Sequence, residues 1–210
     1  MNNNTTTATT NNTTIAADAV PSATDLAIIE KKALDALHRS MAKTDLDDLL
    51  RGARRSLLLL DCSSSMSQRI RSGKRRIDAL RDVTNELVKT HPVPMAAFGG
   101  HNQVEVVEAP IEPTGSTPLD VAIEFGHQQG ANHLVVVTDG EPNSETAAFN
   151  AARAFGGPID VFYVGDGVGR GVEFAKELAR MTGGTFGLSS LDAPKELSSK
   201  ISGLLGDGSL

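Results

Sequence analysis

The sequence predicts an α/β fold with an open, mostly parallel sheet that has one antiparallel edge strand and helices on both faces. Two observations support this prediction. From residue 56 onward, short apolar segments alternate with amphipathic helical segments, a pattern typical of strands joined by helical crossovers. Two apolar segments, "HLVVVTDG" and "IDVFYVGDG", are continuous rather than alternating, as expected for strands buried on both faces. The expected fold class is therefore Rossmann-like.

The expected elements follow in order along the chain. We predict six strands, at residues 57–60, 93–98, 104–107, 134–138, 159–164 and 185–188. We predict five helices, at residues 74–90, 119–129, 144–155, 171–182 and 193–205. The link "GGHNQ" between the second and third strands is too short for a helix, so these two strands should form an antiparallel hairpin.

The chain has room for one substantial core, because 40 % of its 210 residues are hydrophobic. Residues 1–22 form an Asn/Thr-rich tract that we expect to be disordered, since it cannot bury enough apolar surface to order itself. Residues 23–52 carry two helical stripes and should form a helical extension, either packed on the domain or acting as a partner-binding arm. The α/β domain should span residues 55–206, followed by a short tail at 207–210.

Composition excludes several classes of function. The net charge of −6 argues against nucleic-acid binding, which needs a basic excess or a concentrated basic face. The single cysteine, Cys62, excludes internal disulfides and a cysteine-rich zinc site. No segment approaches the roughly 20 apolar residues of a membrane span, and the N-terminal residues lack the features of a secretion signal. We therefore expect a cytoplasmic protein without a membrane partner, or a virion component if the chain is phage-encoded.

Oxygen-bearing side chains gather in three loops that should meet at one edge of the sheet. Loop one holds Asp61, Ser63 and Ser65 directly after the first strand. Loop two holds Thr117 just before a helix, and loop three holds Asp139 directly after the fourth strand. Ligands of an open parallel sheet bind beyond the carboxyl ends of its strands. Two carboxylates and three hydroxyls are the hard oxygen donors that Mg²⁺ prefers, so the sequence predicts a divalent-cation site.

The order and gaps of these residues resemble the metal-ion-dependent adhesion site of von Willebrand factor type A domains. The resemblance rests on D-x-S-x-S in "DCSSSMS", the threonine of "GSTPLD" and the aspartate of "VVVTDGEP", and it covers residues 56 to about 205. It implies that Mg²⁺, or Mn²⁺ or Ca²⁺, binds five ligands, some through water: Asp61, Ser63, Ser65, Thr117 and Asp139. Ser64 stands where the family often has glycine, which implies a less flexible loop.

The resemblance implies binding rather than catalysis, with an Asp or Glu of a partner protein completing the metal's coordination. Hydroxyl ligands carry no charge, so the ion is left short of anionic donors and attracts an incoming carboxylate. Hydrolysis would need a general base or an activated nucleophile. Four histidines lie outside the three loops, where we expect them to be solvated or to cap helices: His91, His101, His127 and His133. We therefore expect no enzymatic activity.

A basic segment, "QRIRSGKRRIDALR", follows loop one and holds six of the twenty basic residues. One interpretation is a solvated helix face whose cations pair with Asp78 and Asp82. The other is a partner-binding rim in which Arg69, Arg71 and Lys74 steer an acidic partner segment toward the metal.

Three hypotheses for function remain open at this point. The first is a metal-dependent interaction module in an intracellular multi-protein assembly, such as an AAA+ ATPase complex, where relatives by fold serve. The second is a structural component of a phage particle or secretion machine, with the N-terminal extension as its contact. The third is a Mg²⁺-dependent hydrolase acting on a phosphorylated small molecule, which would require a base near Asp61.

Overall fold

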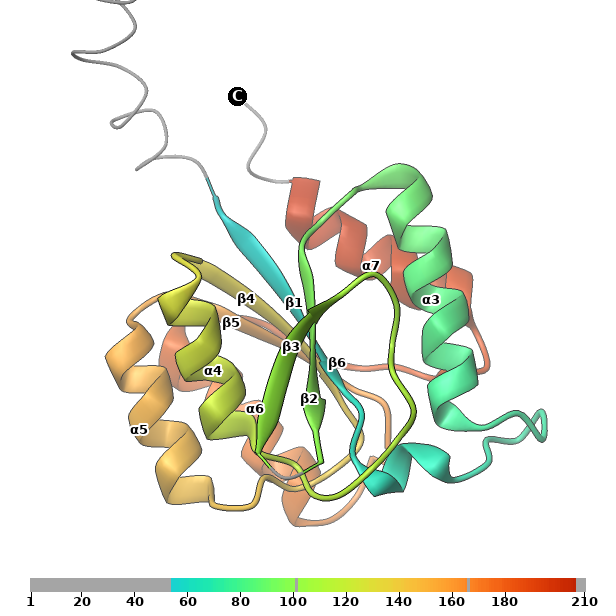
Figure 1. Ribbon diagram of the computed structural model, residues 1–210, viewed down its shortest axis with the longest axis horizontal. Helices are drawn as coiled ribbons and strands as arrows, with labels where there is room; N and C mark the ends of the chain where they lie inside the picture. Colours follow the sequence, from blue (N-terminus) through green and yellow to red (C-terminus); the bar gives the residue numbers. More distant parts are fainter. Residues whose placement is uncertain (1–53, 101, 166, 207–210) are drawn as a thin grey trace, which may run out of the picture. The chain divides into compact units, whose positions relative to one another are not determined.

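A computed structural model of the chain describes residues 54–100, 102–165 and 167–206. The expected tail at 1–22, the helical extension at 23–52 and the tail at 207–210 all lie outside these residues, so those expectations stay predictions. The described part contains a six-stranded sheet with helices on both faces (Figure 1). One strand is antiparallel and all the others are parallel, which confirms the expected fold class.

The elements lie close to the predicted positions. The strands are β1 Ser56–Asp61, β2 Met95–Gly99, β3 Gln103–Val107, β4 His133–Thr138, β5 Ile159–Tyr163 and β6 Phe186–Leu188. The α-helices are α3 Arg76–Thr90, α4 Leu119–Gln128, α5 Glu145–Phe155, α6 Arg170–Thr182 and α7 Pro194–Gly206. A short 3₁₀ helix, η1 Ser64–Ser67, was not predicted from the sequence. None of the described helices combines the length and the apolar character needed to cross a lipid bilayer.

The strand order is β3-β2-β1-β4-β5-β6. As expected, β2 and β3 pair antiparallel and place β3 at one edge of the sheet. From β1 the chain builds outward to β2 and β3 on one side and then returns to place β4 on the other side of β1. Strand order therefore reverses between β1 and β4, and the carboxyl ends of these two strands flank the position where ligands of such sheets bind.

The continuous apolar segment of β1 is explained by a core on each face of the sheet. Leu57 and Leu59 pack in one buried cluster with residues of α4, α5 and α6. Leu58 and Leu60 pack in a second cluster with residues of α3 and α7. Figure 1 shows α3 and α7 covering one face and α4, α5 and α6 covering the other. Because successive strand residues point to opposite faces, both sets must be apolar.

The expectation that the histidines are solvated or cap helices is wrong for His133, which is 1 % exposed. Its ring nitrogens lie 2.7 Å from Ser56 Oγ and 2.7 Å from Asp160 Oδ2. Burial opposes ionisation of Asp160, yet the hydrogen bonds from His133 and Thr185 outweigh it and lower the pKa of this carboxyl. His133 therefore joins β1, β4 and β5 through buried polar contacts, away from the carboxyl ends of the strands.

Candidate metal centre

Asp61 ends β1 with its side chain fully buried and both carboxylate oxygens engaged. Its Oδ1 accepts a hydrogen bond of 2.8 Å from the backbone N–H of Ser63, two residues further along loop one. Its Oδ2 accepts a hydrogen bond of 2.5 Å from the hydroxyl of Thr138, at the end of the neighbouring strand β4. The side chain is therefore held in one orientation from its own loop and from β4.

Ser63, Ser65 and Asp139 form a continuous chain of hydrogen bonds between loops one and three. The hydroxyl oxygens of Ser63 and Ser65 lie 2.9 Å apart. The Ser65 hydroxyl donates to Oδ1 of Asp139 over 2.6 Å. Three of the five predicted ligands are thus in direct contact, although Ser65 and Asp139 are 74 positions apart in the sequence.

Thr117 in loop two is positioned by loop three. Its N–H donates to the side-chain oxygen of Asn143 over 2.9 Å, and the N–H of Asn143 donates to the carbonyl of Thr117 over 2.9 Å. A Cβ placed on Gly140 would lie 3.5 Å from the Thr117 hydroxyl oxygen and 3.7 Å from that of Ser65. The Thr117 and Ser65 hydroxyls therefore face the same small space beside Gly140.

Loop two also holds the backbone of loop one. The N–H of Ser64 donates to the carbonyl of Gly115 over 3.1 Å, and the N–H of Thr114 donates to the carbonyl of Cys62 over 2.9 Å. Gly115 has a φ of +63°, and a Cβ at this position would lie 2.3 Å from the carbonyl oxygen of Gly100. Only glycine fits here, because it lacks the Cβ and tolerates the left-handed conformation.

The electrostatics of the site are those of two buried carboxylates with one cation. Burial, followed by the negative charge of Asp139, raises the pKa of Asp61 from its usual 3.8 to about 6. Arg76, the first residue of α3, donates from Nη1 to Oδ2 of Asp139 over 2.7 Å. The side chain of this arginine is 10 % exposed and that of Asp139 is 0 % exposed. With both carboxylates ionised, the three groups carry a net charge of −1.

These residues fit a hard divalent cation. All five predicted ligand atoms are oxygens. A cation beside them would offset the two effects that raise the pKa of Asp61, burial first and the charge of Asp139 second. Among the residues that the structure describes, no three His, Cys, Asp or Glu side chains group to hold a metal. A metal held by these residues would therefore depend on the hydroxyls as well as the carboxylates, which favours Mg²⁺ over softer ions.

Similar architectures occur in several solved structures, although no protein-family model and no curated protein matches the sequence. One is a von Willebrand factor type A protein from Catenulispora acidiphila, with a TM-score of 0.59 and 16 % identity, covering 73 % of this chain and 43 % of that one. The fold is that of a von Willebrand factor type A domain. Because the match spans less than half of the Catenulispora protein, it concerns the fold of this region alone.

Two further structures support the type A assignment of the fold. The von Willebrand factor domain of the type V pili tip protein Mfa5 from Porphyromonas gingivalis has a TM-score of 0.53 and 10 % identity, covering 73 % of this chain and 95 % of that one. The conserved hypothetical protein BatB from Bacteroides thetaiotaomicron has a TM-score of 0.50 and 19 % identity, covering 73 % and 99 %. At these identities the likeness establishes the type A fold alone, and the candidate metal centre rests on the residues themselves.

Sequence reasoning missed two residues of this candidate site, Arg76 and Thr138. Arg76 is one of six cations in the basic segment, and neither charge nor spacing separates it from its exposed neighbours. The contribution of Thr138 becomes evident only once β1 and β4 are known to be neighbours. The register pairs Leu60 with Val137, which places Thr138 next to Asp61 across the two strands.

The other cations of the basic segment divide into two groups. The first group pairs with carboxylates on the surface of α3 and loop two, as the solvated-face interpretation expects. Lys74 pairs with Asp82, while Arg75 and Arg81 each pair with both Asp78 and Glu112. Arg69 and Arg71 are exposed and precede α3. Of the three predicted rim residues, these two keep their charge available beside the candidate metal centre, whereas Lys74 lies 2.5 Å from Asp82.

Cys62 follows Asp61 but points into the core cluster beneath α3 and is 0 % exposed. Burial raises the pKa of its thiol from 9.0 to about 12. Because the thiolate is the reactive form, this cysteine is a poor nucleophile and a poor metal ligand at neutral pH.

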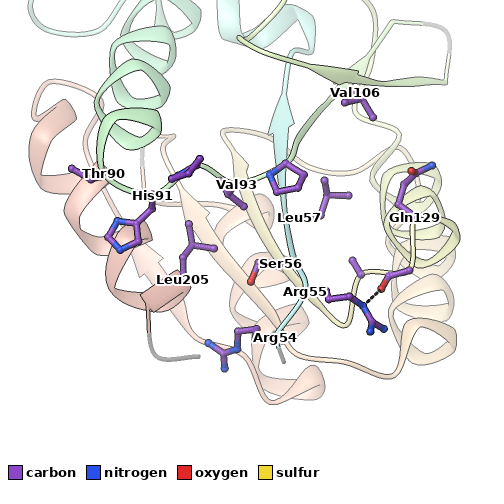
Figure 2. Close-up of a pocket in the computed structure, with 14 residues that line it drawn as sticks. Arg54, Arg55, Ser56, Leu57, Thr90, His91, Val93, Val106, Gln129 and Leu205 are labelled. Carbon is purple, nitrogen blue, oxygen red and sulfur yellow. Dashed lines mark hydrogen bonds between the residues drawn. The ribbon is translucent and has the colours of Figure 1, made fainter. Parts of the chain in front are cut away.

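A separate hollow of about 580 Å³ lies at the opposite end of the sheet, where β1 begins (Figure 2). Its two arginines are already engaged: Arg54 donates to the carbonyl of Leu204 over 2.7 Å and Arg55 to that of Gly130 over 2.8 Å. The described residues that line it include no aspartate or glutamate. This hollow therefore lacks the ligands of the candidate metal centre.

Proposed function

We propose that this chain is a protein-interaction module that binds a divalent cation and, through it, an acidic side chain of a partner protein. The ligands would be Asp61, Ser63, Ser65, Thr117 and Asp139, and the preferred ion Mg²⁺, with Mn²⁺ or Ca²⁺ as substitutes. The observation that carries this proposal is the hydrogen-bonded chain from Ser63 through Ser65 to Asp139 at the point where strand order reverses. When bound, the ion would supply a positive centre for a partner's carboxylate.

The charges of the site favour an additional anionic ligand. Two ionised carboxylates and the Arg76 guanidinium sum to −1, so a bound divalent ion would leave a net charge of +1. A buried positive charge is costly unless it is paired. A glutamate or aspartate of a partner restores neutrality, and its contribution to binding then depends on the metal.

We propose binding rather than catalysis because of the partners that the hydroxyls have. Ser63 and Ser65 hydrogen-bond to one another, and Ser65 donates to Asp139, so no histidine or lysine among the described residues is their hydrogen-bond partner. Metal-assisted hydrolysis needs a separate base positioned at a bound water.

We further propose that the partner belongs to a multi-protein assembly such as an AAA+ ATPase complex, and we propose neither a membrane nor a nucleic-acid partner.

The substitution Asp61→Asn tests the proposal, because asparagine keeps the shape and a hydrogen-bond acceptor but removes the charge. Titration calorimetry with Mg²⁺ and Mn²⁺ should give one site in the wild type and at least a hundred-fold weaker binding in the variant. Asp78→Asn is the matched control, since Asp78 pairs with Arg75 and Arg81 on the surface of α3. Equal metal binding by wild type and Asp61→Asn would contradict the proposal.

A further inference from the structure

A second hollow lies at the carboxyl edge of the sheet, beside the candidate metal centre. We call it the arginine pocket, and its volume is about 890 Å³. Its lining comes from the turn before α3, the start of α3, the end of β5 and the segment after β6. The polar side chains that line it include three arginines, a serine and an aspartate: Arg69, Arg71, Arg76, Ser189 and Asp192.

Two observations place the arginine pocket directly against Asp139, one of the proposed metal ligands. Arg76 lines the pocket and also donates to Oδ2 of Asp139 over 2.7 Å. Gly165 lines the pocket as well, and a Cβ on this residue would lie 2.8 Å from the carbonyl oxygen of Asp139. One extended peptide segment could therefore reach both sites.

The pocket has an excess of positive charge. Arg69 donates to the carbonyl of Gly73, which holds its side chain near the turn without neutralising it. Arg71 is exposed and makes no hydrogen bond or ion pair with any residue that the structure describes. The opposing charge is Asp192, whose oxygens accept from the N–H of Ser72 over 3.1 Å and from the hydroxyl of Ser190 over 3.4 Å.

Ser189 gives independent evidence for a ligand. The residue is 9 % exposed and lines the pocket, and its hydroxyl oxygen is buried without a hydrogen-bond partner among the described residues. Its backbone is fixed, because its N–H donates to the carbonyl of Tyr163 over 3.0 Å. A buried hydroxyl without a partner is unfavourable. Rotation about its Cα–Cβ bond would let it donate to an acceptor in the pocket.

We propose that the arginine pocket binds a second carboxylate of the same acidic segment whose first carboxylate completes the metal site. Guanidinium groups bind carboxylates through two parallel hydrogen bonds, and the volume accommodates more than one side chain. Arg71 and Arg69 would hold this second carboxylate and Ser189 would donate to it, while Arg76 separates the two subsites. This inference rests on the proposed function, and it makes the recognised feature a pair of acidic residues.

Hexaglutamate is a suitable probe, because it offers carboxylates at every spacing along one peptide. Its affinity for the full chain should be measured with Mg²⁺ present by anisotropy of a labelled peptide, beside N-acetylglutamate amide, which can fill one subsite only. We expect Arg71→Gln to weaken hexaglutamate binding about ten-fold and Ser189→Ala to weaken it several-fold. Binding of the single glutamate derivative to the metal should change little in either variant.

Lys74→Gln is the matched control, because it removes one charge from the same basic segment at a residue that does not line the pocket. If Lys74→Gln weakens hexaglutamate binding as much as Arg71→Gln does, general surface charge explains the effect and the pocket proposal is overturned. If hexaglutamate binding is lost in EDTA but is unchanged in Arg71→Gln, the pocket proposal is also overturned, while the proposed metal function stands. Binding that needs Arg71 and Ser189 but survives both EDTA and Asp61→Asn supports the pocket and contradicts the metal function.

Discussion

Asp61 is a buried carboxylate whose charge the folded chain does not fully compensate. Hydrogen bonds from Thr138 and Ser63 favour its ionised form, but burial and the charge of Asp139 outweigh them and raise its pKa to about 6. A residue whose only role is packing would not need a carboxylate here, since the fold would be more stable with an apolar or neutral side chain at this position. A loss of stability of this kind is expected for a domain whose metal-ligating carboxylate is buried and has no metal bound to it.

The pKa of Asp61 predicts how the stability of the metal-free protein changes with pH. This carboxyl titrates near 3.8 when unfolded and near 6 when folded, so between these values the native state binds more protons than the unfolded state. The free energy of unfolding should therefore decrease as pH rises from about 4 to about 7, and the contribution of this group is roughly 1 to 3 kcal/mol. Urea titrations in EDTA across this range measure it.

Asp61→Asn is the control for that pH dependence, because it removes the titrating group. In EDTA at about pH 7 the variant should be more stable than the wild type by the same amount, and the difference should vanish near pH 4. Mg²⁺ at a concentration that saturates the wild type should reverse the order, since the wild type gains more stability from the ion than the weakly binding variant does. A wild-type curve parallel to that of the variant would show that Asp61 does not titrate in this range.

Arg76 serves as the internal counter-ion of Asp139, and replacing it should change stability and metal affinity in opposite directions. Arg76→Met leaves a fully buried carboxylate unpaired, which should lower the free energy of unfolding in EDTA by about 3 kcal/mol. The same change removes a positive charge beside the ion, so at about pH 8 Mn²⁺ should bind at least ten-fold more tightly. Chemical denaturation and calorimetry measure the two effects.

Arg75→Met is the matched control for Arg76→Met, since Arg75 is the adjacent arginine and its ion pairs are at the surface. It should alter neither Mn²⁺ affinity nor stability appreciably, because exposed pairs are screened by solvent. Weaker Mn²⁺ binding in Arg76→Met would mean that the arginine orients Asp139 more than it competes with the ion.

At the scale of elements, the site depends on how loop two is braced against loop one. Gly115 makes this possible, because its left-handed conformation lets the backbone approach Gly100 closely. Gly115→Ala should destabilise the fold by roughly 2 kcal/mol or more, from the left-handed conformation and the collision with the Gly100 carbonyl. Metal affinity should fall as well, since displacement of loop two moves Thr117.

Gly130→Ala is the control that separates conformation from collision. Gly130 also has a positive φ, of +74°, but nothing lies within 4 Å of a Cβ built there. It should cost only the conformational part, roughly 1 kcal/mol, and leave metal binding unchanged. Equal effects of the two substitutions on metal binding would indicate that the brace between the loops is unimportant.

The sequence predicted all six strands and all five described α-helices, because their patterns of apolar residues are regular. The boundaries that moved did so for local reasons. β2 begins at Met95 rather than at Val93, where prolines on both sides cannot donate hydrogen bonds to a neighbouring strand. The turn η1 escaped prediction because four polar or flexible residues carry no periodic signal, and only the burial of Met66 distinguishes it.

At the scale of the whole molecule, the strand order brings the three loops together. The prediction that these loops meet needed only the rule that parallel strands end at one edge. The structure then places Ser63, Ser65 and Asp139 in direct contact and Thr117 nearby. Sequence could not anticipate Arg76 or the arginine pocket. Both depend on the angle at which α3 leaves loop one and on the path of the chain after β6, and neither has a local signature.

The two faces of β1 should contribute comparably to global stability, because Leu58 and Leu59 are both 0 % exposed and belong to different core clusters. Leu58→Ala and Leu59→Ala should each lower the free energy of unfolding by about 2 to 5 kcal/mol. Val88→Ala, at a side chain that is 45 % exposed, should change it by less than about 0.5 kcal/mol. Urea denaturation followed by circular dichroism measures all three. A large effect on one face only would mean that the layers unfold separately.

The burial of Cys62 has a practical consequence for measuring this protein. The chain has no other cysteine, and this thiol is both inaccessible and poorly ionised. Maleimide reagents should therefore leave the native wild type unlabelled and modify any exposed cysteine introduced elsewhere. Ser64→Cys would place such a handle on the exposed variable position of loop one. A fluorophore attached there would report occupancy of the neighbouring site in real time, without the deletion of a native cysteine.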